Sequence, residues 1–232
     1  MLVPAEIRQQ LSRKAVIMHM RQNAMDHPET GSWFGNVTCS LPSETWPEMN
    51  GKPMFALCQI NVLELPYCPP LLEDMAMITL FVAPQIGTNY LYPNGNQWLL
   101  RAYHSLDDLI PLAPVPTASE IPAVALAATP PRDDFPCWED VNIDLPLNIA
   151  EHYYDHFSTS DGIKLGGWPN LVQTRVHWEK IRKFAQSRPE FVFQIDSFYP
   201  GNWLWGNSGV GYVGRGTAPG REDQWFLEWQ ST

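Results

Sequence analysis

The chain has 232 residues, of which 25 are acidic and 15 are basic, giving a formal net charge of −10. A chain of this length hides roughly 70% of its unfolded surface, so a sizeable core can form without disulfides or metals. The negative charge argues against a nucleic-acid ligand, and no apolar run approaches the ~18 residues of a membrane-crossing helix.

The acidic residues are concentrated between residues 102 and 163, where eleven acids accompany a single base, Arg132. They are Asp107, Asp108, Glu120, Asp133, Asp134, Glu139, Asp140, Asp144, Glu151, Asp155 and Asp161. Such a segment would repel a nucleic acid but attract a basic protein, so it predicts a basic protein partner. A solvated acidic connector without any partner is the alternative.

The amino-terminal part predicts one helix followed by loop. Residues 4–22 begin with a proline in the first turn, and Ile7, Leu11, Ala15 and Met18 follow at helical spacing. Residues 31–51 are rich in turn-forming residues, and we expect them to wrap the first β unit as ordered loop.

Four short strands are predicted next, at residues 55–62, 75–82, 90–92 and 98–103. Asn94-Gly95 gives a hairpin signal before the last of them, and the short connections favour an antiparallel sheet. The following segment holds seven prolines within residues 111–136, although residues 124–127 could add a strand.

The remaining chain predicts two helices and four strands. Residues 147–157 read as a short helix with Ile149, Tyr153 and Phe157 on one side, and residues 175–186 as a helix that buries Trp178, Ile181 and Ala185. The strands are expected at residues 191–196, 203–205, 209–213 and 225–229.

Residues 55–61 and 191–196 are similar segments, each with a glutamine within an apolar alternation, Gln59 and Gln194. Each follows a turn of aromatic residues and glycine, at residues 33–35 and 166–169. A pattern that recurs once indicates an internal duplication.

We therefore predict an α+β fold of two related, mainly antiparallel β units with a few peripheral helices, built into one domain. The first unit comprises residues 1–110 and the second residues 147–232. An acidic, proline-rich connector, residues 111–146, joins them.

No complete catalytic motif or cofactor motif is found. Residues 209–214 match the dinucleotide pattern G-x-G-x-x-G, but the chain that follows cannot readily start the helix that a pyrophosphate needs. His152 and His156 stand four residues apart, a spacing that can hold zinc, but no third ligand is evident, which makes them weak candidates. We expect no cofactor.

The four cysteines, Cys39, Cys58, Cys68 and Cys137, form no C-x-x-C pair, and the chain shows no amino-terminal signal segment. This usage favours a reduced, cytoplasmic protein. Cys39, Cys68 and Cys137 are candidate nucleophiles, with His104 and His177 as possible bases, although no spacing ties a thiol to a base.

The matched polar residues of the two segments allow two interpretations. A buried amide without partners costs roughly 1 to 3 kcal/mol, so each glutamine must be bonded, for instance by the backbone of its preceding turn. Alternatively, the two copies line one polar, aromatic cleft for a small ligand. The candidate cleft residues are Gln59, Asn61, Trp168, Gln194, Asp196, Trp203 and Trp205.

The motifs resemble those of the YwqG-like family, bacterial proteins with a domain of unknown function. The resemblance rests on residues 33–35, 46–47 and 55–61 and, in the second half, on residues 165–169, 193–196 and 205–209. It implies a duplicated α+β fold in the cytoplasm without a known catalytic residue. Some relatives occur beside toxin and immunity proteins.

Two functions are therefore expected as alternatives. The first is a non-enzymatic, protein-binding and possibly immunity-type module. The second is an enzyme or small-ligand binder that uses a cleft between the two β units.

Overall fold

The computed structural model describes residues 3–86, 92–113, 115, 121–178 and 182–232. It is mainly an antiparallel β structure with a few short helices. One sheet of eleven strands dominates it, and two pairs of two-residue strands complete it in the described ranges, β3 (Cys39–Ser40) with β9 (Ile110–Pro111) and β4 (Glu48–Met49) with β5 (Lys52–Pro53).

The large sheet has a single spatial order with one side branch. Its strands in that order are β15 (Trp225–Gln230), β14 (Val210–Gly216), β13 (Pro189–Asp196), β12 (Ile163–Gly166), β1 (Arg13–Met20), β10 (Val124–Ala128), β2 (Trp33–Phe34), β6 (Phe55–Asn61), β7 (Met77–Val82) and β8 (Trp98–Tyr103). The branch is β11 (Arg132–Asp134), which pairs with the start of β1.

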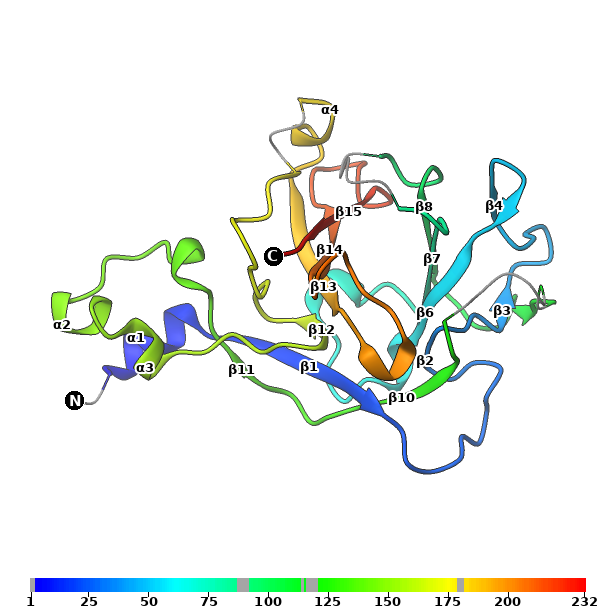
Figure 1. Cartoon of the computed structure of the whole chain (residues 1–232). Coiled ribbons are helices and arrows are strands. Elements are labelled where there is room, and N and C mark those ends of the chain that lie inside the picture. Colours follow the sequence, from blue (N-terminus) through cyan, green and yellow to red (C-terminus); the bar gives the residue numbers. More distant parts are fainter. Residues whose placement is uncertain (1–2, 87–91, 114, 116–120, 179–181) are drawn as a thin grey trace.

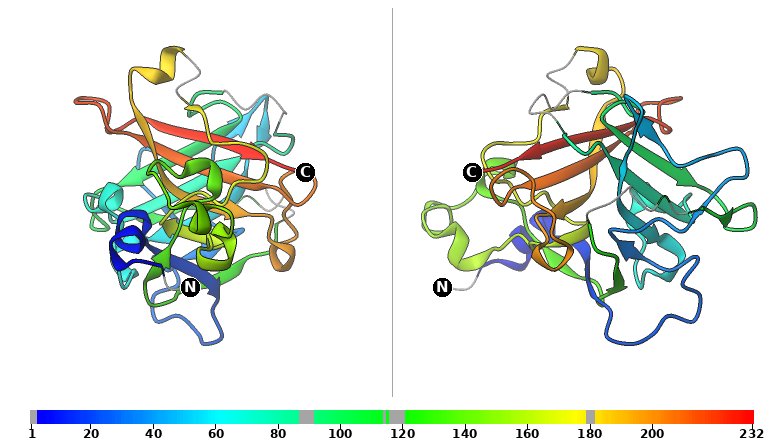
Figure 2. Two further views of the ribbon diagram at one scale, coloured as in Figure 1. Left: turned by 90° about the vertical axis from the view of Figure 1, so that its left-hand side faces the viewer. Right: turned by 45° about the vertical axis from the view of Figure 1, so that its right-hand side comes forward.

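The sheet bends into two arms (Figures 1 and 2). One arm holds β12 to β15 and the other β6 to β8, and β1, β10 and β2 join them. The main core fills the space between the arms, since Leu100 of β8 and Leu227 of β15 belong to the same cluster. A single core therefore depends on strands from both ends of the chain.

The long helix predicted over residues 4–22 is wrong. The helix α1 (Ala5–Leu11) is short, and the chain then continues as β1, one of the central strands of the sheet. The spacing of apolar residues fits a helix, but β12 and β10 pair with the two edges of β1 and bury Val16 and Met18. Tertiary pairing thus overrides the helical pattern.

Most of the predicted strands are confirmed, namely β6, β7, β8, β13, β14 and β15, and the apolar run within the proline-rich segment forms β10. The turn at Asn94-Gly95 is present, with Gly95 at φ +89°. The predicted strand at 90–92 lies largely outside the described residues. At 203–205 there is a single bridge between Phe198 and Trp203 instead of a strand.

The helix predicted over residues 175–186 is limited to α4 (Arg182–Ala185) in the described part, since residues 175–177 are not helical. Trp178 is buried as predicted, whereas Ala185 is exposed. Ile181 lies outside the described residues.

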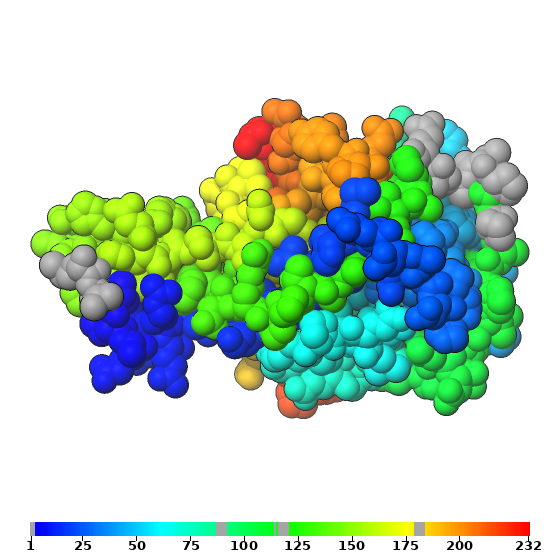
Figure 3. Space-filling view, turned by 90° about the horizontal axis from the view of Figure 1, so that it is seen from below, coloured from blue at the N-terminus to red at the C-terminus, as the bar shows by residue number. Residues whose placement is uncertain are grey.

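A helical lobe, residues 3–12 and 135–160, projects from the sheet (Figures 1 and 3). The predicted helix at 147–157 is divided into α2 (Leu147–Ala150) and α3 (Tyr153–His156). Ile149, Tyr153 and Phe157 are buried together, as the spacing predicts, against Leu11 of α1.

The lobe and the loops also contain short 3-10 turns: η1 (Val62–Glu64), η2 (Pro70–Leu72), η3 (Trp138–Asp140) and η5 (Tyr199–Gly201). No helix in the described ranges has the length and apolar character that crossing a membrane requires.

Candidate functional site

Gln59 lies on the outer face of β6, beneath the loop that includes residues 29–38. Its Oε1 accepts a hydrogen bond from the Thr38 amide at 2.9 Å, and its Nε2 donates to the Gly31 carbonyl and the Thr38 hydroxyl, both at 2.8 Å. The side chain is completely buried. The amide therefore fixes a loop to the sheet.

Gln194 occupies the corresponding place on β13. Its Oε1 accepts from the Asn170 amide at 2.9 Å, just after the turn at residues 166–169, and its Nε2 donates to Asp196 Oδ1 at 2.7 Å. It too is completely buried. The interpretation in which each glutamine bonds the backbone of its neighbouring loop is confirmed at both positions.

The surroundings of the two glutamines match in further details. The β6–β7 register shifts between Ala56 and Cys58, and the β13–β14 register shifts between Phe191 and Phe193. In each strand the shift therefore lies between the third and the first residue before the glutamine. The strand residues paired with the glutamines, Trp33 and Lys164, each stand two residues before a glycine with positive φ, +70° at Gly35 and +71° at Gly166.

The two glutamines do not line one cleft, which corrects that expectation. Five strand-to-strand steps separate β6 from β13. At about 4.8 Å each, they place the glutamines about 24 Å apart along the sheet. Each amide lies under a different loop and is already bonded, so neither is free to bind a ligand in common with the other.

Asn61 and Asp196 also hold loops. Asn61 Nδ2 donates to the Thr30 carbonyl at 2.9 Å, and its Oδ1 accepts from the Leu63 amide, which starts η1. Asp196 Oδ2 accepts from the Gly162 amide at 2.7 Å. Burial raises the pKa of the Asp196 carboxyl to about 6.

The three candidate tryptophans are packed inside the protein rather than exposed as a platform. Trp168 donates its Nε1 hydrogen to the Leu11 carbonyl at 2.8 Å, and the Arg13 guanidinium lies 3.5 Å from the centre of its ring. Trp203 and Trp205 belong to the main core, with their rings edge to face at 5.2 Å.

The glycines of residues 209–214 serve this packing. They lie in and beside β14, which continues as a strand instead of starting a helix. A Cβ atom at Gly211 would lie 2.5 Å from the Trp205 ring, and one at Gly214 would lie 2.7 Å from the Trp178 ring. Close packing against tryptophan rings therefore explains the glycines that match the dinucleotide pattern.

Local contacts and burial describe several of the candidate histidines and cysteines. His152 precedes α3 and faces Asp155 at 3.5 Å, and the described residues contain no group of three side chains that could hold a metal. Cys39, Cys58, Cys68 and Cys137 are free thiols. Burial raises the pKa of Cys39 to about 11 and that of Cys58 to about 12, which disfavours the nucleophilic thiolate.

A buried ion pair at the junction of sheet and lobe is not apparent from the sequence. Lys164 Nζ lies 3.1 Å from Asp134 Oδ2 and also donates to the carbonyls of Ser160 and Trp168. Burial lowers the pKa of Lys164, and the Asp134 carboxylate opposes that shift. All three ammonium hydrogens are used, so the pair is structural.

An exposed aromatic surface lies on the helical lobe. We call Trp138, Glu151, Tyr154 and Asp155 the acidic aromatic face; together with residues 150, 152 and 153 they line a hollow of about 430 Å³. Trp138 is 45% exposed and Tyr154 is 62% exposed. The Tyr154 hydroxyl accepts a hydrogen bond from the Trp138 amide at 3.1 Å, and Tyr153 packs edge-on against both rings.

Comparison with known proteins adds the family. No curated protein matches the chain. A family model described as "Domain of unknown function (DUF1963)" matches residues 34–214, a range that contains both glutamines, the loop held by Gln194, part of the loop held by Gln59 and residues 135–160 of the helical lobe. Because the match extends over most of the chain, the protein belongs to this family of domains of unknown function.

Proposed function

We propose that the protein is a non-enzymatic binding module that holds a basic protein partner on the acidic aromatic face. The observation that carries this proposal is the exposure of two large aromatic rings, Trp138 and Tyr154, next to carboxylates that no lysine or arginine of the described residues neutralises. Tryptophan and tyrosine are the residues that most often dominate the binding energy of protein interfaces.

The charge around the face supports a basic partner. Several acids of the segment between residues 102 and 163 are already paired: Asp134 with Lys164, Asp133 with Lys14 and Asp140 with Arg175. In contrast, within the described ranges no lysine or arginine lies at ion-pair distance from Glu151 or Asp155. These two carboxylates would attract positive charge from outside the molecule.

The order of the face supports binding without a large entropic cost. The Trp138 amide to Tyr154 hydroxyl bond and the two edge-on contacts of Tyr153 hold the rings before any partner arrives. Rings that are fixed in advance lose little rotamer freedom on binding.

We also infer that the two arms of the sheet arose by duplication, as the sequence predicts. The matching loop bonds of Gln59 and Gln194, the equivalent register shifts and the paired glycines support this inference. Among the described residues, the helical lobe and its acidic face have no counterpart in the arm of β6 to β8, so the lobe is the place where a separate function could be added.

The nature of the partner follows from the resemblance to the YwqG-like family. Its bacterial, cytoplasmic members that occur beside toxin and immunity proteins make a basic toxin domain the partner class to test first. This is an analogy with the family and carries less weight than the geometry of the face.

The test is to capture partners with the wild-type protein at about 50 mM and at about 500 mM salt. A tenfold rise in salt shortens the Debye length about threefold and so weakens charge attraction. A basic protein should be retained at low salt and lost at high salt. Affinity for that protein should fall by roughly 30-fold in Tyr154→Ala, the ratio that corresponds to about 2 kcal/mol.

Tyr199→Ala is the matched control, because Tyr199 is also strongly exposed but lies in η5, outside the lobe. It should bind the partner as the wild type does. Capture of no basic protein at either salt concentration, or equal affinity of the Tyr154→Ala and Tyr199→Ala variants, would contradict the proposal.

A further inference from the structure

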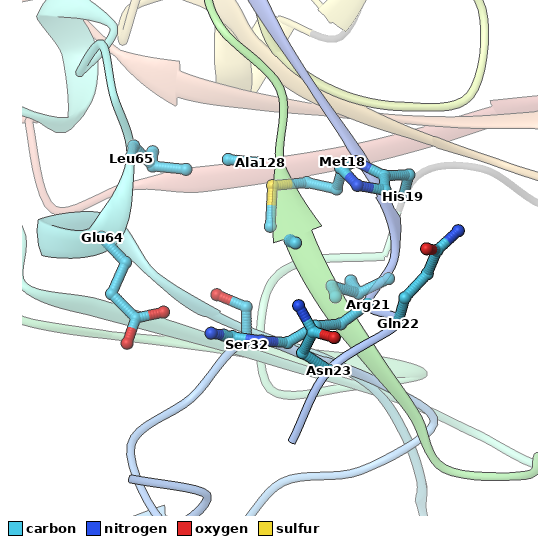
Figure 4. Close-up of a pocket in the computed structure, with 11 residues that line it drawn as sticks. Met18, His19, Arg21, Gln22, Asn23, Ser32, Glu64, Leu65 and Ala128 are labelled. Carbon is cyan, nitrogen blue, oxygen red and sulfur yellow. The ribbon is translucent and has the colours of Figure 1, made fainter. Parts of the chain in front are cut away.

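A second hollow, of about 540 Å³, opens beside the end of β1 and shares no residue with the acidic aromatic face. Figure 4 shows Glu64 and Leu65 on one side and Met18, Arg21 and Gln22 on the other, with Ala128 of β10 and Ser32 between them. In Figure 3 the three chain segments involved, coloured blue, cyan and green, meet on one face of the molecule. Its volume lies within the range of small-ligand sites.

The edge of β10 that faces this hollow is unpaired at Ala128, within the part of the chain that the structure describes. The Arg21 amide donates to the Ala125 carbonyl, and the Thr129 amide donates to the Ile17 carbonyl, so residues 125 and 129 point their backbone groups toward β1. Because the direction alternates along a strand, Leu126 and Ala128 point theirs to the other side. The Leu126 amide indeed donates to the Ser32 carbonyl on that side.

The strand that should continue the sheet beyond Ser32 is missing. β2 pairs with β10 only at Val124 and Ala125, and before Ser32 the chain turns away, since the Thr30 amide bonds the His27 carbonyl. The amide of Ala128 thus has no hydrogen-bond partner among the described residues. An unpaired strand edge is a template for another extended chain.

The side chains around this edge carry one positive and one negative charge. Arg21 is half-buried and Glu64 is exposed, and neither has an ion-pair partner in the described part of the chain. Met18, Leu65 and Leu126 supply an apolar wall. A ligand that satisfies this site needs backbone hydrogen-bonding groups, an apolar side chain, an anion and a cation.

We propose that the hollow binds a short peptide in extended form, with its backbone paired to Ala128, its carboxylate at Arg21 and its amino group at Glu64. Three extended residues span about 10 Å, which suits a site of this size. A phosphate or nucleotide fits less well, because Glu64 would repel it.

The test is calorimetric titration of the full-length protein with a zwitterionic tripeptide of leucine, alanine and leucine at neutral pH. Binding should weaken about tenfold or more when the peptide is acetylated and amidated, because each terminus loses a charged hydrogen bond. Arg21→Ala and Glu64→Ala should each weaken it to a similar extent. Arg221→Ala and Glu48→Ala, at exposed positions outside the hollow, are the matched controls and should leave the peptide affinity unchanged.

Two proline variants test the strand edge itself. Ala128→Pro removes an amide that points into the hollow, so the fold should persist and peptide binding should be lost. Ala127→Pro removes an amide directed at β1. Unlike Ala128→Pro, it should lower the thermal midpoint of unfolding in addition to weakening peptide binding.

The proposal is overturned if the blocked tripeptide binds as well as the free one, if the folded Ala128→Pro variant binds normally, or if no binding occurs at millimolar peptide. Should Ala128→Pro fail to fold, the Arg21→Ala and Glu64→Ala titrations decide. Tyr154→Ala should leave peptide binding unchanged, which separates this site from the acidic aromatic face.

Discussion

Single buried polar side chains hold the loops of this protein on its sheet. Gln59 and Gln194 each bond loop backbone from a strand position, and Lys164 bonds two loop carbonyls besides Asp134. Leaving such a group unpaired in the core costs about 1 to 3 kcal/mol, and more for a charge. The bonds of these residues therefore serve the fold, whereas candidate binding side chains such as Tyr154 and Glu64 are exposed.

Asp196 gives the stability of the protein a specific pH dependence. Its pKa is raised to about 6 by burial, against about 3.9 in an unfolded chain. Between these values the native state binds more protons than the unfolded state, so the free energy of unfolding contributed by Asp196 falls as the pH rises from 4 to 6. The full difference is about 3 kcal/mol at most.

Urea unfolding of the wild type and of Asp196→Asn at pH 4, 5, 6 and 7 measures this contribution. The stability of the wild type relative to the variant should decrease over this range and level off above the folded pKa. A constant difference between the two proteins would show that Asp196 does not titrate as its burial requires.

At the scale of elements, the two arms of the sheet are tied by one arginine. Arg215 of β14 donates to both carboxylate oxygens of Asp74, at 2.6 and 2.7 Å, and to the Leu71 carbonyl at 2.7 Å. Asp74 and Leu71 lie in the connection that leads into β7. The hydrogen bonds from Arg215 hold the pKa of Asp74 below its usual value.

We predict that Arg215→Lys lowers the free energy of unfolding by about 1 to 3 kcal/mol, because an ammonium group cannot reproduce the two-pronged contact. Denaturant unfolding at neutral pH measures the effect. Arg221→Lys, at an exposed position, is the control and should stay within about 0.5 kcal/mol of the wild type. Equal stability of the two variants would mean that the tie contributes nothing.

At the scale of the whole molecule, the halves of the chain depend on each other. β1 lies within the first 110 residues, but both of its long neighbours, β10 and β12, come from the rest of the chain. The main core likewise takes Leu100 from one part and Leu227 from the other. A shared core of this kind makes unfolding cooperative.

Residues 1–110 and 111–232, produced as separate fragments, should therefore not fold alone. Each should lack a cooperative urea transition followed by far-ultraviolet circular dichroism, whereas the intact chain should show one. A cooperative transition in either fragment would mean that the corresponding unit is an independent domain.

The strands β6 and β13 could be predicted from the sequence because each alternates apolar residues around a glutamine and is bounded by turns. β1 could not, since Ile7, Leu11, Ala15 and Met18 fit a helix equally well and only pairing with β10 and β12 decides the conformation. The helix predicted at 175–186 is likewise reduced, in the described part, to α4.

The candidate site was less predictable than the fold. Gln59 and Gln194 stand out in the sequence because they are polar within apolar strands, and for that reason they are bonded inside the protein. Arg21 and Glu64, by contrast, are ordinary charged residues that lie far apart in the sequence. Their placement around the open edge of β10 depends on where β2 ends.

The sequence by itself determined the antiparallel β character, the strands that carry the two glutamines and the acidic segment, because alternation, turns and charge are local properties of the chain. The tertiary structure alone decided that the amino-terminal segment is a central strand, that the two glutamines lie apart, and which charges remain exposed. These outcomes depend on strand pairing between distant residues, and no local pattern specifies which strand edges will meet.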